Sequence, residues 1–311
     1  MNRSISLRHF RAFIAVANTG SFTLAAAELF LTQSALTATI QQFEEVIGFK
    51  LFDRSTRRVA LTPLAAGFKE QAERILNQFE GAVSDLESLA HGHRGHVRIA
   101  AAASVTHYFL AKAISRLKQA SPNITVSLHD EASRQVERMV INGDIDFAFA
   151  SPHQKLAELV YTPIFEDRYG ILCNSSHRYA SGKRPLRWQE LDTSDFVAFT
   201  DDTGIGAFLR THAARPELMQ GIRNEVSNTS SLCALLRVDG GYSILPALAA
   251  GRVEDRDLVF RELVAPTLTR QVYLVARKLR SLSPSSELLL DAMRATLRDT
   301  PVPPSVRILV D

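Results

Sequence analysis

Four side chains that both donate and accept hydrogen bonds lie close together near the N-terminus: Gln33, Ser34, Thr37 and Gln41. The same stretch has apolar residues at every third or fourth position: Leu36, Ile40, Phe43 and Ile47. This spacing predicts a helix with one buried face and with the polar side chains on its other faces. Exposed amide and hydroxyl groups on a helix can bond to the edges of DNA bases. The alternative is an ordinary solvated helix.

Three arginines follow this helix. Arg54, Arg57 and Arg58 flank a Ser-Thr pair between two short apolar segments, residues 50–52 and 59–61. We interpret this stretch as a hairpin, or wing, whose basic tip suits phosphates or the minor groove. A solvated basic turn is the alternative.

A helix that contacts base edges, or reading helix, enters the DNA major groove only when a second element holds it against the phosphates. Ser21 is a suitable N-cap for such an element, a short helix over residues 22–30, and Thr32 is the next cap. The small alanines at 25–27 allow the two helices to pack closely. We therefore predict a helix-turn-helix and add Ser21, Thr23 and Thr32 to its DNA-binding set.

The distribution of charge favours this interpretation. Residues 1–63 hold seven basic and four acidic side chains, a net charge of +3. The whole chain has 36 basic and 33 acidic side chains, so the remainder is neutral. All of the net positive charge thus lies on the segment that needs it for phosphates.

Length and composition indicate an intracellular protein of several domains. A chain of 311 residues with 46% hydrophobic content suggests two or three packed domains. Its two cysteines, Cys173 and Cys233, fit a reducing cytosol. Neither a signal peptide nor an apolar run of about 18 residues is present. We expect a cytoplasmic protein that does not bind membranes.

A long helix is predicted over residues 64–91, after the winged helix-turn-helix domain of residues 1–63. Its apolar residues alternate at spacings of four and three: Phe68, Ala72, Ile75, Phe79, Ala82, Leu86 and Leu89. This is the seam of a coiled coil, so we expect a homodimer through this helix. Residues 92–96 form the predicted hinge. The three histidines at 91, 93 and 96 lack an accompanying carboxylate or cysteine, so we expect no metal there.

From residue 97 onward, strands alternate with helices, which is typical of an α/β domain with a parallel sheet. The predicted strands cover residues 97–104, 124–129, 145–150, 164–173, 196–199, 222–226, 242–245 and 270–275. Helices are expected over residues 108–119, 133–141, 229–238 and 286–297. Short connections near residues 161–163 and 265–270 suggest two lobes with a cleft between them. The first lobe comprises residues 97–163 and 267–303, and the second comprises residues 164–266.

Polar residues follow several of these strands, where ligands bind in such sheets. The candidate effector-binding residues are Ser104, Thr106, Ser133, Thr203, Asn228 and Thr229, with Asp202 beside them. Each has a simpler interpretation as a helix N-cap, and one residue can fill both roles. Together they suggest a site for a small anion or polar metabolite.

With this pattern assembled, the chain resembles the LysR-type transcriptional regulators over essentially its full length. The resemblance rests on LRHF at 7–10, GSFT at 20–23, QSAL at 33–36, GFKLFDR at 48–54, GDIDFA at 143–148 and GYSILP at 241–246. It implies a winged helix-turn-helix, a dimerising linker helix and a two-lobed effector domain of the periplasmic-binding-protein type 2 fold. It also implies a homotetramer on double-stranded promoter DNA that responds to a small co-inducer and holds no resident cofactor.

Departures from the family pattern alter the expected contacts. Ser34 stands where many members have proline, and Ala38 stands where many have arginine. The missing arginine shifts base readout onto Gln33, Ser34, Thr37 and the wing. Asp239 occupies a position usually held by glycine. Ser104 matches a hydroxyl that often contacts the effector in the family, and Ser133 matches a similar threonine.

Two rival functions are disfavoured. An enzyme is contradicted by the absence of G-x-S-x-G, P-loop, H-E-x-x-H and C-x-x-C motifs, and a transport protein by the lack of a signal peptide. A thiol switch is disfavoured because Cys173 and Cys233 have mostly apolar neighbours and no adjacent basic residue. The sequence does not identify the effector, the operator, the target genes or the sign of regulation, and it does not separate dimer from tetramer.

Overall fold

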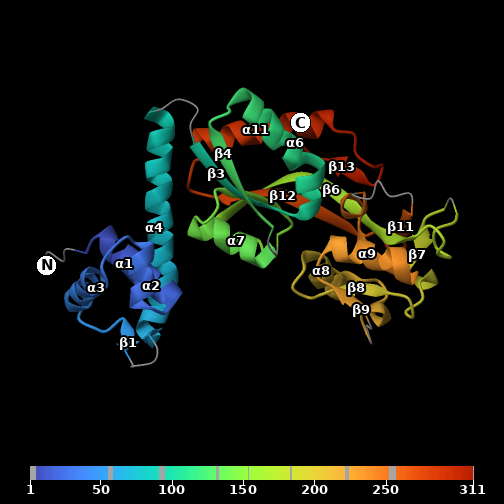
Figure 1. The fold of residues 1–311 in the computed structure, drawn as a ribbon. Helices are drawn as coiled ribbons and strands as arrows, with labels where there is room; N and C mark the ends of the chain where they lie inside the picture. Colours follow the sequence, from blue (N-terminus) through green and yellow to red (C-terminus); the bar gives the residue numbers. More distant parts are fainter. Residues whose placement is uncertain are drawn as a thin grey trace. The chain divides into compact units, whose positions relative to one another are not determined.

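The structure is a computed structural model that describes residues 5–54, 59–90, 95–130, 133–152, 154–182, 184–220, 224–251 and 257–310 (Figure 1). The chain forms two compact units. The first comprises residues 1–86 with 142–144, and the second comprises residues 87–141 with 145–311. None of the described helices has the length and apolar character of a membrane-spanning segment.

The first unit is mainly helical. Its elements are α1 (Leu7–Thr19), α2 (Phe22–Glu28), α3 (Gln33–Ile47), β1 (Phe52–Arg54), β2 (Val59–Leu61) and the long α4 (Pro63–Ala90). The predicted apolar face of α3 is confirmed, because Leu36, Ile40 and Phe43 are fully buried and Ile47 packs against the same core. That core also holds Phe13 of α1.

Both predicted N-caps are confirmed. The Ser21 side chain accepts a hydrogen bond from the backbone N–H of Leu24, and the Thr32 side chain accepts one from that of Ala35. Helix α2 ends at Glu28, two residues before the predicted end. Phe30 adopts a left-handed backbone conformation, φ 55°, which a continuing helix does not allow.

The hairpin forms two residues later than predicted on its first strand. Phe52 pairs with Leu61 and Arg54 with Val59. Before the first strand, the Leu51 N–H donates to the Glu44 carboxylate over 2.9 Å, while the Leu51 carbonyl accepts from the Thr62 N–H over 3.0 Å. This buried carboxylate ties the start of the wing to α3, a role that the sequence did not reveal.

The second unit is an α/β domain built on a nine-stranded sheet. Its first elements are β3 (Gly95–Ala101), α5 (Ala103–Val105), the π-helical turn η1 (Thr106–Leu110), α6 (Ala111–Ala120), β4 (Ile124–His129), α7 (Ser133–Asn142), β5 (Phe147–Ala150) and β6 (Leu159–Asn174). Next come β7 (Leu186–Arg187), η2 (Trp188–Glu190), β8 (Val197–Phe199), α8 (Gly204–His212), η3 (Pro216–Met219), β9 (Asn224–Val226) and α9 (Thr229–Asp239). The last are β10 (Tyr242–Pro246), α10 (Ala247–Ala250), β11 (Leu258–Val264), β12 (Thr269–Arg277), α11 (Pro284–Asp299) and β13 (Val306–Ile308).

The sheet is mixed, so the prediction of a parallel sheet was right only in part. Strands β3, β4 and β5 pair in parallel, as do β8 and β9 in a separate two-stranded sheet. Strands β10, β11, β12 and β13 all pair antiparallel with β6. The unusual length of β6 makes this possible: its first half pairs with β12, and its second half pairs with β10 and β11.

The connection predicted near residues 161–163 is not found, since β6 runs through them without a break. Pro163 lies opposite Tyr273, where the register between β6 and β12 shifts. A bulge tolerates a residue without an N–H, which explains how proline sits inside this strand.

Helices cover both faces of the part of the sheet formed by β3, β5 and β12. Helices α6 and α11 pack together on one face around Phe109, Phe147 and Met293 (Figure 1). Helix α7 covers the other face around Val140 and Val275. Helix α10 connects this half with the rest of the sheet: Ala247 and Leu248 join the first core, while Ala249 and Ala250 join the core around β8, β9 and α9.

Candidate functional site

The polar residues predicted to read DNA lie along the first three turns of α3. Gln33, Ser34 and Gln41 are exposed, and Thr37 is half-buried. The hydroxyl of Thr23 on α2 donates to the Gln33 side-chain oxygen over 3.3 Å. That contact orients the Gln33 amide so that its two N–H donors have no partner among the described residues.

Neighbouring hydroxyls extend this surface. Thr32 and Ser34 share a hydrogen bond of 3.1 Å, and Thr23 is exposed beside them on α2. Ser21 is half-buried because it caps α2. The structure thus brings Thr23, Thr32, Gln33 and Ser34 together, while Thr37 and Gln41 lie one and two turns further along α3.

The wing arginines are placed only in part. Arg54 is the last residue of β1, whereas Arg57 and Arg58 lie outside the described residues. Two other cations of this unit are paired with carboxylates: Lys50 lies 2.9 Å from Glu44 and Arg11 lies 3.4 Å from Glu80. The side chains of both cations remain at least half exposed.

In the second unit, the candidate residues form two pairs of strand ends. Ser104 and Ser133 follow the parallel neighbours β3 and β4, and Thr203 and Asn228 follow the parallel neighbours β8 and β9. Ser104 is buried in the short helix α5. Ser133 is the first residue of α7, and Thr106 is half-buried in the π-helical turn. Within the described ranges, no hydrogen bond joins one pair to the other.

The capping interpretation holds for Thr203 and Asn228. Thr203 Oγ1 accepts from the N–H of Gly206 over 2.9 Å and donates to the carbonyl of Thr200 over 2.8 Å. Asn228 Oδ1 accepts from the N–H of Ser231 over 2.8 Å. The Thr203 hydroxyl has thus used its only hydrogen, whereas Asn228 keeps its amide N–H groups for another partner. Thr229 is half-buried and opens α9.

The structure adds a buried ion pair that sequence reasoning missed. Asp167 on β6 and Arg270 on β12 are direct cross-strand partners, joined by two bonds of 2.9 and 2.8 Å. Arg270 Nη2 also donates to Ser104 Oγ over 3.2 Å, and the Leu248 N–H of α10 donates to Asp167 over 3.1 Å. Charged residues inside apolar strand segments were the signal in the sequence. Their pairing links α5, β6, β12 and α10.

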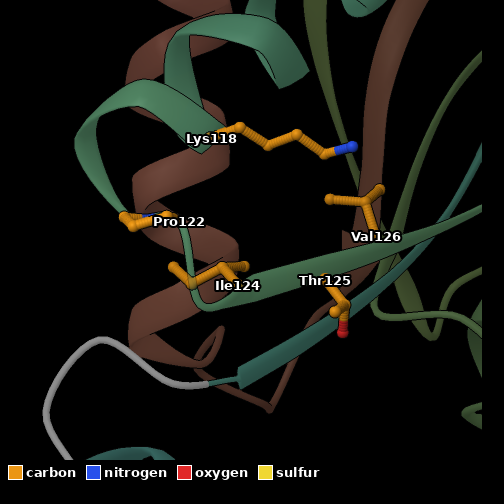
Figure 2. A pocket seen from close by; sticks show the side chains of 5 residues that line it. All are labelled: Lys118, Pro122, Ile124, Thr125 and Val126. Carbon is orange, nitrogen blue, oxygen red and sulfur yellow. The ribbon is translucent and has the colours of Figure 1, made fainter.

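A surface pocket lies elsewhere, beside the edge strand β4. Figure 2 shows its lining side chains, Lys118 from the end of α6 and Pro122, Ile124, Thr125 and Val126 from the following turn and strand. None of the candidate effector-binding residues lines it.

The part of the chain that the structure describes contains no cluster of three or more histidine, cysteine or acidic side chains arranged for a metal ion. His91 of the predicted linker helix and His93 of the predicted hinge lie outside that part. His96, predicted as the end of the hinge, lies in β3 and bonds through its two ring nitrogens to Thr125 and Ser127 on β4.

Both cysteines are buried free thiols. Burial raises the pKa of Cys173 to about 11, although the charge of Arg261 opposes the shift. Such a thiol holds almost no thiolate at neutral pH, and the thiolate is the reactive form.

Replacing both cysteines by alanine should therefore leave specific DNA binding and its response to effector unchanged. Fluorescence anisotropy on operator DNA, with and without prior exposure to peroxide, checks this expectation. A peroxide effect present in the natural protein and absent from the double variant would establish a redox role.

A helical unit with a polar reading helix and a basic hairpin, followed by an α/β unit with polar strand ends, defines a one-chain DNA-binding regulator with a ligand-binding domain. Family models agree. Residues 7–66 match the model described as bacterial regulatory helix-turn-helix protein, lysR family, and residues 90–298 match the LysR substrate binding domain. The chain belongs to the LysR family and is a DNA-binding transcriptional regulator, not an enzyme.

Known relatives and solved structures are similar to this chain over nearly its whole length. It is 29% identical to the uncharacterized HTH-type transcriptional regulator YfeR of Shigella flexneri, and the alignment covers 93% of each chain. It is 27% identical to the uncharacterized HTH-type transcriptional regulator YbhD of Escherichia coli, and the alignment covers 90% of this chain and 88% of YbhD. Its fold is similar to that of CbnR complexed with its target DNA, with a TM-score of 0.67 at 21% identity, 94% of this chain and 100% of CbnR being covered. Full-length OxyR from Pseudomonas aeruginosa gives a TM-score of 0.68 at 18% identity, with 97% and 98% covered.

Proposed function

We propose that this regulator binds promoter DNA in the cytoplasm through the first three turns of α3 and the wing, and responds to a small molecule bound at the strand ends of its substrate-binding domain. Base edges are contacted by Gln33, Ser34, Thr37 and Gln41. The sugar-phosphate backbone of the DNA is contacted by Ser21, Thr23, Thr32, Arg54, Arg57 and Arg58. The unpaired amide donors of Gln33, held by Thr23, are the observation that carries this proposal.

The direct test is binding of the purified protein to its own upstream intergenic DNA, measured by fluorescence anisotropy with random DNA as competitor. Binding that resists the competitor supports the proposal. Binding that is weak, lost with salt and equal on random DNA contradicts it for this promoter. A genome-wide binding selection then decides whether the operator lies elsewhere or the domain reads no sequence.

Gln33→Ala should weaken operator binding by ~1–3 kcal/mol and leave binding to random DNA nearly unchanged, because only base contacts distinguish the two DNAs. Gln42→Ala is the matched control. Gln42 is an exposed glutamine of the same helix that lies on another face. Equal losses on both DNAs would remove Gln33 from the set of base-reading residues.

We further propose that α4 dimerises the protein. From its middle onward, α4 carries an exposed apolar stripe in which Ile75 is 42%, Phe79 41%, Val83 37% and Leu86 67% exposed. Side chains at this spacing line one face of a helix, and a second copy of α4 buries such a stripe as in a coiled coil. The N-terminal part of the predicted seam differs, because Ala72 and Phe68 pack on the core of their own unit.

A dimer also suits the DNA, since two reading helices fit adjacent major grooves of a two-fold operator. The homotetramer that the family resemblance implies is part of the same proposal. Sedimentation of the full-length protein across a concentration series separates monomer, dimer and tetramer.

A further inference from the structure

Arg270 holds unused hydrogen-bond donors next to Ser104. A guanidinium has five N–H groups. Two of those on Arg270 go to Asp167 and one goes to Ser104. Nη1 donates to no described residue, and it is not fully buried. Nη1 therefore keeps some contact with solvent, although the side chain is only 11% exposed.

Ser104 adds a further donor at the same place. Its oxygen accepts from Arg270 Nη2 over 3.2 Å, so its own hydrogen remains available. Arg270 thus offers only donors to a ligand, and Ser104 offers one donor beside its remaining lone pair. A set in which donors predominate and one group is a cation favours an anionic group rich in acceptor oxygens, and arginine recognises the planar carboxylate particularly well.

The pair with Asp167 makes these donors rigid. Asp167 is fully buried and accepts both from Arg270 and from the Leu248 N–H. Burial alone lowers the pKa of Arg270, but the adjacent Asp167 charge more than offsets this, so the pKa is raised and the group stays charged. The ion pair is neutral as a whole, which suits a monoanion better than a dianion. Donors that are held in place also bind with a small entropy cost.

Aromatic side chains lie on the same side of β6. Tyr169 is two residues beyond Asp167, so its side chain points to the same face of the sheet. Phe208 of α8, half-buried, stacks on Tyr169 with ring centroids 4.9 Å apart. Tyr169 is fully buried, and Phe208 also stacks on His212 with ring centroids 4.3 Å apart, so these rings form a packed wall beside the ion pair.

We propose that the effector is a small monocarboxylate, and that Arg270 Nη1 and the Ser104 hydroxyl are the donors that hold its carboxylate. This inference rests on the proposed function of the substrate-binding domain, and it names the chemical class of the ligand.

The test uses simple probes on the purified full-length protein without DNA. Its Tm is measured in concentration series of acetate, benzoate, benzamide and inorganic phosphate, with chloride at matched ionic strength. We expect a saturable rise in Tm with a carboxylate and none with benzamide, which has the same ring but no anionic oxygens. No rise with either carboxylate, an equal rise with benzamide, or a rise with phosphate alone overturns the proposal.

Variants localise the effect. Ser104→Ala and Arg270→Lys should each weaken the best carboxylate at least about tenfold, since each loses a hydrogen bond to a charged group. Ser243→Ala is the control, because it removes a fully buried hydroxyl that has no hydrogen-bond partner among the described residues. If Arg270→Lys does not fold, Ser104→Ala decides the test, and unchanged affinity in that variant overturns the assignment.

Promoter binding without any probe is measured in parallel. If the protein binds the carboxylate but shows no specific promoter binding, only the proposed DNA-binding function is refuted. Specific promoter binding with no carboxylate binding would refute only the ligand class.

Discussion

Asp167→Ala is expected to lower the free energy of unfolding of the substrate-binding domain by about 3–5 kcal/mol. The substitution leaves the Arg270 charge without its partner at a position where the side chain is 11% exposed. It also leaves the Leu248 N–H without its acceptor. Urea denaturation followed by circular dichroism measures the change.

Asp299→Ala provides the matched control. Asp299 pairs with Arg116 over 2.7 Å, a distance similar to that of the buried pair, but both side chains are largely exposed. Solvent screening keeps the cost of losing such a pair below about 1 kcal/mol. A similar loss in the two variants would show that burial does not set the strength of the Asp167–Arg270 pair.

A double substitution separates stability from function. Asp167→Leu with Arg270→Met replaces the buried charges by apolar groups, which often recovers most of the lost stability. The recovered protein should still fail to bind the carboxylate probe, because its donors are gone. Recovery of stability together with probe binding would mean that Arg270 has only a structural role.

The helix-turn-helix could be predicted from sequence because its determinants are local. Ser21 and Thr32 cap helices that begin at the next residue, and the buried face of α3 follows a period that any helix must have. Phe30 was the exception. Its left-handed backbone shortens α2, and phenylalanine carries no signal for that conformation.

The sheet domain was harder to predict because its determinants are distant in sequence. Pro163 was interpreted as part of a short connection between lobes, whereas it lies inside a strand, where proline is uncommon. Only the partner strand β12, about a hundred residues later, supplies the bulge that accommodates it. The antiparallel pairing of four strands with β6 is likewise a property of the assembled sheet.

The same argument applies to the candidate effector site. The strand-end hydroxyls were identifiable because strand ends follow from local pattern. The role of each hydroxyl could not be predicted, because it depends on contacts with residues distant in sequence. Thr203 uses its hydroxyl as a helix cap, whereas Ser104 accepts a hydrogen bond from Arg270 on a distant strand. Charged residues inside otherwise apolar strands deserve to be treated as site candidates in such sequences.

Phe79→Asp should convert the protein to a monomer and weaken operator binding roughly 10²-fold or more. Phe79 lies at the centre of the exposed apolar stripe of α4, with Ile75 and Val83 one turn away on either side. A charge there would be buried against the second helix, and its desolvation opposes association. A monomer reaches one half-site at a time and therefore loses the gain from simultaneous binding.

Leu279→Asp is the control with the same added charge, since Leu279 is almost fully exposed outside α4. Sedimentation velocity and anisotropy on operator DNA should be measured on both variants. A Phe79→Asp protein that remains dimeric would place the interface elsewhere. A monomeric variant with undiminished operator affinity would instead show that one copy supplies all the specific binding. In that case separating the two copies removes no contact with the operator.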